Sequence, residues 1–230
     1  MVHLKQAGDR RPLVDEIYDY LHEEIASMRL KPGDRISEAD IAARFGVSRQ
    51  PVRDAFSRLE NQDLLLIRPQ RATEVKRFSA REIEKSRFVR AAVEAEVLRR
   101  AAAKCDRVGT AMLEDCLDRQ RQAIADNDYE AFGALDYAFH RTLCQIARLD
   151  FAFEVISSEK AKVDRLCILG LSKEDRMPQL VADHEEIAAC VTGGDAERAV
   201  VAGMRHLSRL DATIESITAT NESFFEESPG

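Results

Sequence analysis

Two short helical patterns on either side of a single glycine constrain the fold of this chain more than any other feature. The first pattern opens at Ser37, has Asp40 three positions later as a capping signature, and stops at Gly46. The second opens at Ser48 and tolerates Pro51, because the first turn of a helix holds N–H groups that lack a partner within the helix. Two such helices joined by a tight turn predict a helix-turn-helix, whose second helix reads DNA.

The second of these helices carries side chains suited to reading bases. Arg49 and Arg53 are four residues apart and therefore share one face near the start of the helix. The guanidinium fork of arginine matches the O6 and N7 acceptors of guanine in the major groove. Ser48 and Gln50 can contact phosphate or base edges, and Arg44 lies just before the turn.

A small β-wing is predicted after this helix. Residues 64–75, LLLIRPQRATEV, have strand composition on either side of a turn, which would bring Arg68 and Arg71 to the DNA backbone or minor groove. The alternative is that Arg49 and Arg53 are solvated arginines on an ordinary helical bundle, but helix, turn, arginine pair and wing together favour DNA binding. The residues predicted to contact DNA are Arg44, Ser48, Arg49, Gln50, Arg53 and Arg71.

The stretch IAARFGVSRQPVRDAFSRLENQDLLLIRPQRATEV resembles the winged helix-turn-helix of GntR-type bacterial transcription regulators, whose hallmark is a VSRxPVRxAxxRLE core. The resemblance implies that Arg49 and Arg53 contact the operator and that Ser48 caps the helix and binds phosphate. The wing of this family usually carries an Arg-Gly pair, whereas Arg71 is followed here by Ala72. A wing tip that required a positive φ would be costlier without glycine.

The rest of the chain predicts a helical bundle. Proline and glycine are sparse and alternating β patterns are almost absent, so the expected fold class is mostly α, with the N-terminal winged helix-turn-helix followed by an all-helical, about six-helix antiparallel bundle. We expect a DNA-binding domain over residues 1–77 and an effector-binding and dimerisation domain over residues 78–230, with a frayed C-terminal end. The predicted bundle helices cover residues 79–104, 110–126, 128–148, 150–170, 177–192 and 195–217.

The distribution of charge is compatible with this division. The net charge is −7, but residues 1–77 hold 14 of the 34 Lys and Arg and 13 of the 41 Asp and Glu, so that this part is +1 and the remainder is −8. An N-terminal part with a net charge near zero can still carry a local basic surface that binds DNA. No apolar run approaches the roughly 20 residues needed to span a bilayer, and no apolar signal core is present, so we expect a cytoplasmic protein without a membrane partner.

Three histidines of the predicted bundle fall in three different helices. His140, His184 and His206 each have apolar neighbours at helical spacing, and Asp136 lies one turn before His140 on the same face. If they converge inside the bundle, three imidazoles and a carboxylate would suit zinc, nickel, copper or iron(II). The spacing alone leaves open that each histidine satisfies its own core hydrogen bond and that Asp136 pairs with an arginine.

The segments DYAFH, DHEEI and GGDAERAVVAGMRH resemble the metal-binding members of the FCD ligand-binding domain, found in the FadR branch of the same family. The resemblance implies an all-helical domain that holds a divalent transition metal, with zinc foremost and nickel or iron as alternatives. The implied metal ligands are Asp136, His140, His184 and His206.

A further motif of that family, VRxxLE, corresponds here to FVRAAVE, with Val93 in place of the usual leucine. The resemblance makes Arg90 a candidate for binding a small carboxylate effector, because a guanidinium fork can hold an acid while one of the acid's oxygens joins a metal. The alternative for Arg90 is an ion pair with Glu94, one helical turn away.

Together these features predict a sequence-specific transcription regulator that binds double-stranded operator DNA as a homodimer and responds to a small organic acid at a metal site. One alternative is a metalloenzyme that acts on a small carboxylate and carries a fused DNA-binding head, because an Asp/His site can also activate water. The sequence contains no catalytic motif such as HExxH, so we expect no enzyme activity. Another alternative is a module whose helix-turn-helix contacts a protein partner.

Overall fold

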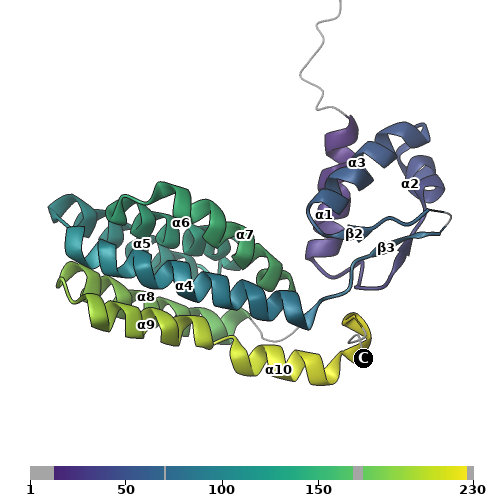
Figure 1. The fold of residues 1–230 in the computed structure, drawn as a ribbon. Coiled ribbons are helices and arrows are strands. Elements are labelled where there is room, and N and C mark those ends of the chain that lie inside the picture. Colours follow the sequence, from purple (N-terminus) through teal and green to yellow (C-terminus); the bar gives the residue numbers. More distant parts are fainter. Residues whose placement is uncertain (1–12, 70, 168–172, 227–230) are drawn as a thin grey trace, which may run out of the picture. The chain divides into compact units, whose positions relative to one another are not determined.

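The structure, a computed structural model, describes residues 13–69, 71–167 and 173–226 of the chain, which divides into two compact units (Figure 1). The described part of residues 1–79 forms the first unit together with residues 221–226, and Ala80–Thr220 form the second. The sequence had placed the boundary after residue 77 and the C-terminal residues in the second domain. The described C-terminal residues instead return to the unit in which the chain begins.

The first unit has three helices and a small sheet, as a winged helix-turn-helix requires. Its elements are α1 (Leu13–Ala26), β1 (Arg35–Ile36), α2 (Glu38–Phe45), α3 (Arg49–Asn61), β2 (Leu65–Leu66) and β3 (Thr73–Val75). The sheet is antiparallel, and β3 lies between β1 and β2. The three helices pack on one another through a buried apolar core that includes Ile17, Leu21, Ile25, Ala42, Val52, Phe56 and Leu59.

The turn between α2 and α3 depends on Gly46. This residue ends α2 with φ 65° and ψ 36°, in the left-handed region, and its N–H donates to the carbonyls of Ala42 and Ala43. A Cβ at this position would meet no atom within 4 Å, so glycine is favoured here by the backbone conformation and not by lack of space. At the other end of α2, Oγ of Ser37 accepts a hydrogen bond from the N–H of Asp40, which is the predicted cap.

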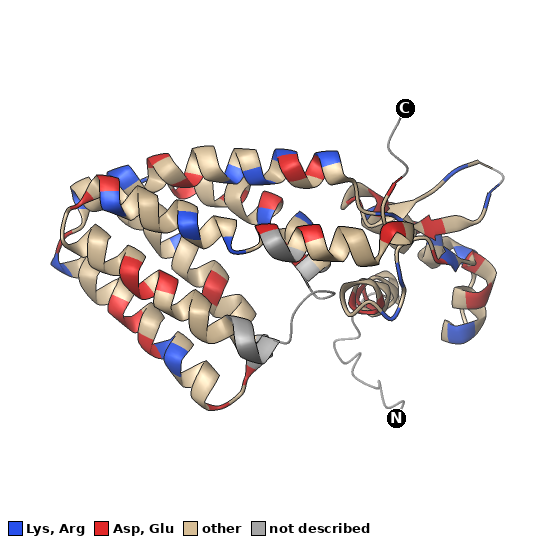
Figure 2. Cartoon of the chain, turned by 90° about the horizontal axis from the view of Figure 1, so that it is seen from below, with Lys and Arg blue, Asp and Glu red and all other residues tan. Residues whose placement is uncertain are grey.

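The wing is the loop that joins β2 to β3. Arg68 and Arg71 are both exposed in it, and the N–H of Arg71 donates to the carbonyl of Arg68 at 3.3 Å. Figure 2 shows basic residues along this loop. None of its described residues, which exclude Gln70, has a positive φ. Ala72 therefore takes the place of the family's glycine without strain in this conformation.

The second unit is entirely helical, but it contains one more helix than predicted among its described residues. The helix expected over residues 195–217 is two helices, separated at residues 209 and 210. The helices are α4 (Ala80–Lys104), α5 (Arg107–Ala125), α6 (Tyr129–Ala147), α7 (Asp150–Cys167), α8 (Lys173–Thr192), α9 (Ala196–Ser208) and α10 (Asp211–Thr220).

The break between α9 and α10 has a tertiary cause. The guanidinium of Arg209, just after α9, donates to both carboxylate oxygens of Asp183 on α8, at 3.1 and 3.0 Å. Asp211, at the start of α10, forms an ion pair with Arg87 on α4. The two ends of the break are therefore held by different helices. Neither glycine nor proline marks this position, so the apolar pattern reads as one continuous helix.

The long helix α4 packs against α6, α7, α8 and α9, and the main core of the unit lies between these helices and α5. Phe139 is fully buried in this core, and its ring stacks on that of His184 with 4.2 Å between centroids. The apolar core therefore surrounds His184, one of the three histidines that could converge inside the bundle. Within the described part of the chain, no helix is long and apolar enough to cross a membrane.

Candidate functional site

The start of α3 exposes the side chains predicted to read DNA. Ser48, Arg49, Gln50 and Arg53 are all exposed, while the opposite face of the helix is buried in the core. Ser48 occupies the position before the helix with an extended backbone, but its side chain makes no capping hydrogen bond. The capping role that the resemblance implies is therefore not seen, because the Ser48 hydroxyl makes no hydrogen bond to the N-terminal end of the helix.

Arg49 and Arg53 differ in how they are held. Nε of Arg53 lies 3.0 Å from Oε2 of Glu38 on α2, and both side chains are partly exposed. Among the residues that the structure describes, Arg49 has no ion-pair partner. Nε2 of Gln50 donates to Asp54 one turn later, at 2.9 Å. Arg53 is thus oriented by an exposed ion pair, which is a weak contact that a DNA base can displace.

The other two predicted DNA contacts lie on either side of this helix in the sequence. Arg44, in the last turn of α2, is exposed and holds its guanidinium over the ring of Tyr20, 4.3 Å from the centroid. Arg71 is exposed in the wing. All six predicted residues are therefore accessible on the first unit.

The four predicted metal ligands converge inside the second unit. Asp136 and His140 lie one turn apart on α6, His184 lies on α8 and His206 on α9. All four are buried, and one potential ligand atom from each lies within 4.8 Å of the others. The alternative in which each histidine serves a separate part of the core requires them to lie apart, which they do not.

Gln120 on α5 determines which ring nitrogen of His184 carries the proton. Nε2 of Gln120 donates to the carbonyl of Leu135 at 3.2 Å, which leaves its Oε1 facing Nδ1 of His184 at 2.8 Å. An amide oxygen only accepts, so Nδ1 carries the proton and Nε2 keeps its lone pair. Burial, and next the charge of His206, lower the pKa of His184 well below its usual value. His184 is therefore a neutral imidazole, as a metal ligand must be.

Glu94 on α4 orients His140 in the same way. Oε2 of Glu94 lies 3.1 Å from Nδ1 of His140, and a carboxylate only accepts, so Nδ1 carries a proton, and in the neutral imidazole Nε2 keeps its lone pair. Burial alone would raise the pKa of Glu94, but His140 and Arg90 outweigh it and hold that pKa at about 2. Nε of the buried Arg90 donates to Oε1 of Glu94 at 2.9 Å. The Arg90–Glu94 pair is therefore formed, and it also supports His140.

Three buried imidazole nitrogens in the cluster lack a hydrogen-bond partner among the described residues: Nε2 of His140, Nε2 of His184 and Nδ1 of His206. Oδ2 of Asp183 is 3.6 Å from Nδ1 of His206, which is too far for a hydrogen bond. Buried polar atoms without partners are costly and rare in folded proteins. Three of them in one cluster indicate that a group absent from the chain belongs there.

The spacing of the cluster indicates which kind of group. Nε2 of His184 lies 3.5 Å from Oδ1 of Asp136. Both atoms present lone pairs, so their approach is unfavourable unless a cation lies between them. Ligand atoms bound to zinc at roughly 2.0–2.1 Å in a tetrahedron are about 3.3–3.4 Å apart. The donor set and its spacing thus fit a divalent transition metal.

Lys160 on α7 holds the second oxygen of Asp136. Its Nζ lies 3.0 Å from Oδ2 and also donates to both oxygens of Asp164, at 2.9 and 2.7 Å. Burial would raise the pKa of Asp136, but the charge of Lys160 chiefly outweighs it and keeps that pKa well below its usual range. Asp136 is therefore ionised, with Oδ2 held by Lys160 and Oδ1 turned toward the histidines.

Sequence reasoning missed Gln120 and Lys160. Gln120 is one of the buried residues of α5. A glutamine at a position where a helix faces the core is unusual, and this could have indicated a polar partner inside the bundle. Lys160 carries no such signal, because charged residues surround it in the sequence of α7. Its burial depends on Asp164, one turn later on α7, and on Asp136 of α6, which only the folded bundle brings to it.

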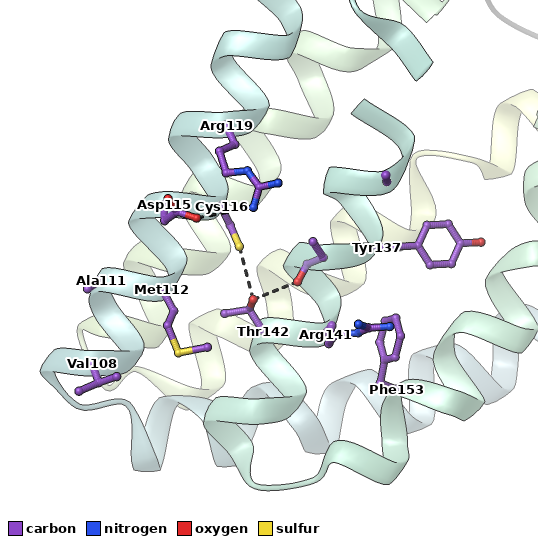
Figure 3. Close-up of a pocket in the computed structure, with 12 residues that line it drawn as sticks. Val108, Ala111, Met112, Asp115, Cys116, Arg119, Tyr137, Arg141, Thr142 and Phe153 are labelled. Carbon is purple, nitrogen blue, oxygen red and sulfur yellow. Dashed lines mark hydrogen bonds and ion pairs between the residues drawn. The ribbon is translucent and has the colours of Figure 1, made fainter. Parts of the chain in front are cut away.

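A groove of about 570 Å³ lies on another side of α6, between α5 and α7 (Figure 3). Tyr137, Arg141 and Thr142 line it, and Sγ of Cys116 lies 3.4 Å from Oγ1 of Thr142. None of the four cluster residues lines this groove. The groove is therefore distinct from the histidine cluster, although α6 contributes to both.

Comparison with known proteins agrees with both units. Residues 13–75 match the gntR family of bacterial regulatory proteins, and residues 87–209 match the FCD domain. The HTH-type transcriptional repressor RspR of Escherichia coli strain K12 is 33% identical over 222 residues, which cover 96% of this chain and 97% of that protein. The chain belongs to the GntR family and carries an FCD domain. This GntR regulator shares the family's DNA-binding function.

One further relative and one solved structure are similar to this GntR protein. An uncharacterized HTH-type transcriptional regulator in an unstable DNA locus of Streptomyces ambofaciens is 33% identical over 210 residues, 91% of this chain and 88% of that protein. A putative transcriptional regulator GntR from Rhodococcus sp. RHA1 has the same fold, with a TM-score of 0.68, 23% identity, and coverage of 88% of this chain and 97% of that one. RspR and the Streptomyces protein are named transcriptional regulators, so the enzyme alternative receives no support.

Proposed function

We propose that this GntR regulator binds a small carboxylate at a divalent metal in its helical unit, and that this binding alters its affinity for operator DNA. Asp136, His140, His184 and His206 would hold the metal, with zinc foremost and nickel or iron as alternatives. The observation that supports the proposal is the group of unpartnered buried imidazole nitrogens, of which Nε2 of His184 lies 3.5 Å from Oδ1 of Asp136. A metal bound there would supply a Lewis-acidic centre to which a carboxylate oxygen can add.

Arg90 is the residue that we propose to hold the rest of the acid. It is buried, and the hydrogen bond that the described residues provide uses its Nε, on Glu94. The two terminal amino groups of the guanidinium remain as donors with the planar geometry that suits a carboxylate. The ion pair with Glu94 keeps the guanidinium in place beside the cluster, so the pair and the effector role are compatible.

On the DNA side, we propose a homodimer that pairs through its helical units and presents two copies of α3 to a palindromic operator. Arg49 and Arg53 would read base edges, while Arg44, Ser48, Gln50 and Arg71 would contact the backbone or flanking bases. The half-sites of such an operator are expected about 34–36 Å apart, or a multiple of this distance. Ligand binding changes operator affinity only if the acid binds the two states of the dimer with different affinity.

The test combines operator binding with a panel of acids. An operator duplex is selected from a random library with the wild-type protein, and its affinity for metal-loaded protein is measured by fluorescence anisotropy with small mono- and dicarboxylic acids. We expect at least one acid to shift the affinity by roughly 5–150-fold, and His140→Ala to abolish the shift. Arg90→Gln should weaken the response while metal content stays unchanged. Metal-loaded protein that responds to none of the acids would contradict the effector proposal.

A further inference from the structure

The C-terminal segment, residues 221–226, is bound to the first unit beside the base of its wing. Its Phe225 pairs with Phe78 as a parallel β-bridge. The N–H of Phe78 donates to the carbonyl of Phe224, and the N–H of Glu226 donates to the carbonyl of Phe78, both at 2.8 Å. The segment therefore adds two backbone hydrogen bonds to the chain just after β3, as an added strand does.

Side chains reinforce this backbone pairing. The rings of Phe78 and Phe225 lie 5.7 Å apart at 46°, and both residues are buried, at 5% and 9% exposure. A segment of this length has no stable fold of its own, so its order depends on the surface that receives it. The first unit therefore presents an apolar and hydrogen-bonding site that fits one extended aromatic segment of this chain.

Arg77 links the bound segment to the wing. Its Nε donates to the carbonyl of Ser223 at 3.0 Å, and its guanidinium forms an ion pair with Glu74 in β3. The same guanidinium lies against Gly33, where a Cβ would be 2.5 Å from Nη2, and the N–H of Gly33 donates to the carbonyl of Val75 at 2.8 Å. The segment, the turn before β1 and the central strand of the wing thus form one continuous network.

The chain that leads into this segment comes from the metal cluster. His206 lies in the last turn of α9, and Arg209, three residues later, is held by Asp183. After the break the chain continues as α10, whose Ile214 and Ile217 are buried, and the segment begins directly after this helix. α10 is therefore the helix that joins α9, which carries His206, to the segment with Phe225.

We propose that residues 221–226 are a built-in ligand of the wing base, and that they carry the state of the metal cluster to the DNA-binding unit. The docking of the segment is supported by its contacts with Phe78 and Arg77. The coupling rests on the proposed metal site, because a bound metal would fix His206, and with it the start of the route through α10. The wing strand β3 and the residues that follow it are then the part of the DNA-binding unit that responds.

The docking is tested by hydrogen–deuterium exchange of the full chain without metal. Phe225→Ala should raise the exchange rate of amides in residues 73–78 at least tenfold, whereas Phe151→Ala, which removes a 70% exposed phenylalanine from α7, should leave them unchanged. Unchanged exchange in Phe225→Ala would overturn the docking. Circular dichroism verifies that both variants are folded.

A milder pair of variants keeps the test decisive if Phe225→Ala fails to fold. Glu226→Pro removes the N–H that donates to Phe78, while Glu226→Ala removes the same exposed side chain and keeps that N–H. The preceding residue has φ −101° and ψ 152°, a conformation that accepts a following proline. Faster exchange at residues 73–78 in the proline variant alone supports the docking, and equal exchange in both variants overturns it.

The coupling is tested by repeating the exchange measurement with Zn²⁺-loaded protein and by measuring the zinc content of each sample. In wild type and Phe151→Ala, zinc should change the exchange of residues 196–220 and also of residues 73–78. In Phe225→Ala, only the change at residues 196–220 should remain. An equal change at residues 73–78 in all three proteins, or none in zinc-bound wild type, would overturn the coupling. If no sample holds zinc, the proposed metal site fails and the coupling with it, whereas the metal-free comparison still decides the docking.

Discussion

The exposed start of α3 and the buried histidine cluster position their functional side chains by different means. Arg49 and Arg53 follow each other on one helix, and the helix alone sets their spacing. The cluster takes one residue pair from α6 and single residues from α8 and α9, and Glu94, Gln120 and Lys160 from three more helices orient it. A local change should therefore have a local effect in the first region, and a change in a distant helix should be felt in the second.

Removal of a metal ligand is expected to have the largest effect. His140→Ala deletes one of four donors, and we expect the metal content of protein purified without chelator to fall to background. The control is His22→Ala, which removes an exposed histidine from the first unit and should leave metal content unchanged. Inductively coupled plasma mass spectrometry gives the metal per chain. Equal metal in the two variants would remove His140 from the site.

Loss of a base-reading arginine is expected to rank next. Arg49→Ala and Arg53→Ala should each weaken binding to the selected operator by about 1–3 kcal/mol, or roughly 5–150-fold. Arg119→Ala, which changes an exposed arginine of the second unit, provides the matched control. The measurement is fluorescence anisotropy at fixed salt. Unchanged operator affinity in both α3 variants would mean that this helix does not read the bases.

Replacement of a residue that orients a cluster histidine is the change that most clearly distinguishes the two regions. Gln120→Leu keeps the size of a buried side chain but loses the acceptor for Nδ1 of His184, so the imidazole is free to place its proton on Nε2. We expect metal affinity to fall by about 10–100-fold. Gln122→Leu, two residues away and exposed, should have no effect. Competition with a chromophoric chelator gives both affinities, and equal values would show that Gln120 does not orient a ligand.

A small effect is expected where an orienting partner is exposed. Glu38→Gln breaks the ion pair with Arg53, whose side chain is 56% exposed, and should change the free energy of unfolding by less than about 1 kcal/mol. Operator affinity should rise slightly, because a negative charge beside the DNA backbone is removed. Glu16→Gln, an exposed acid on α1, is the control in urea unfolding and in operator binding. A loss of operator affinity specific to Glu38→Gln would show that this pair holds Arg53 in its reading position.

The same difference explains what the sequence could predict. Ser37, Gly46 and the apolar residues between them act over one or two helical turns, so the helix-turn-helix could be predicted from their spacing. Asp136 and His140 share a helix turn, but their convergence with His184 and His206 was suggested only by resemblance to the FCD domain.

Other features depend on contacts between distant segments and could not be predicted. The break between α9 and α10 requires Asp183 and Arg87, and the burial of Lys160 requires Asp136 from another helix of the bundle. The sequence predicts a frayed C-terminal end, whereas the described C-terminal segment, residues 221–226, is paired with the first unit. Its order comes from Phe78, nearly 150 positions earlier, which no local pattern connects to it.

X-ray absorption spectroscopy at the metal edge tests the central claim, the metal site built from Asp136, His140, His184 and His206, most directly. Protein purified without chelator is measured as the full chain. The proposed site predicts a first shell of nitrogen and oxygen at roughly 2.0–2.1 Å for zinc, with the outer-shell scattering of three imidazoles. A first shell that contains sulfur, or one without imidazole scattering, would contradict it.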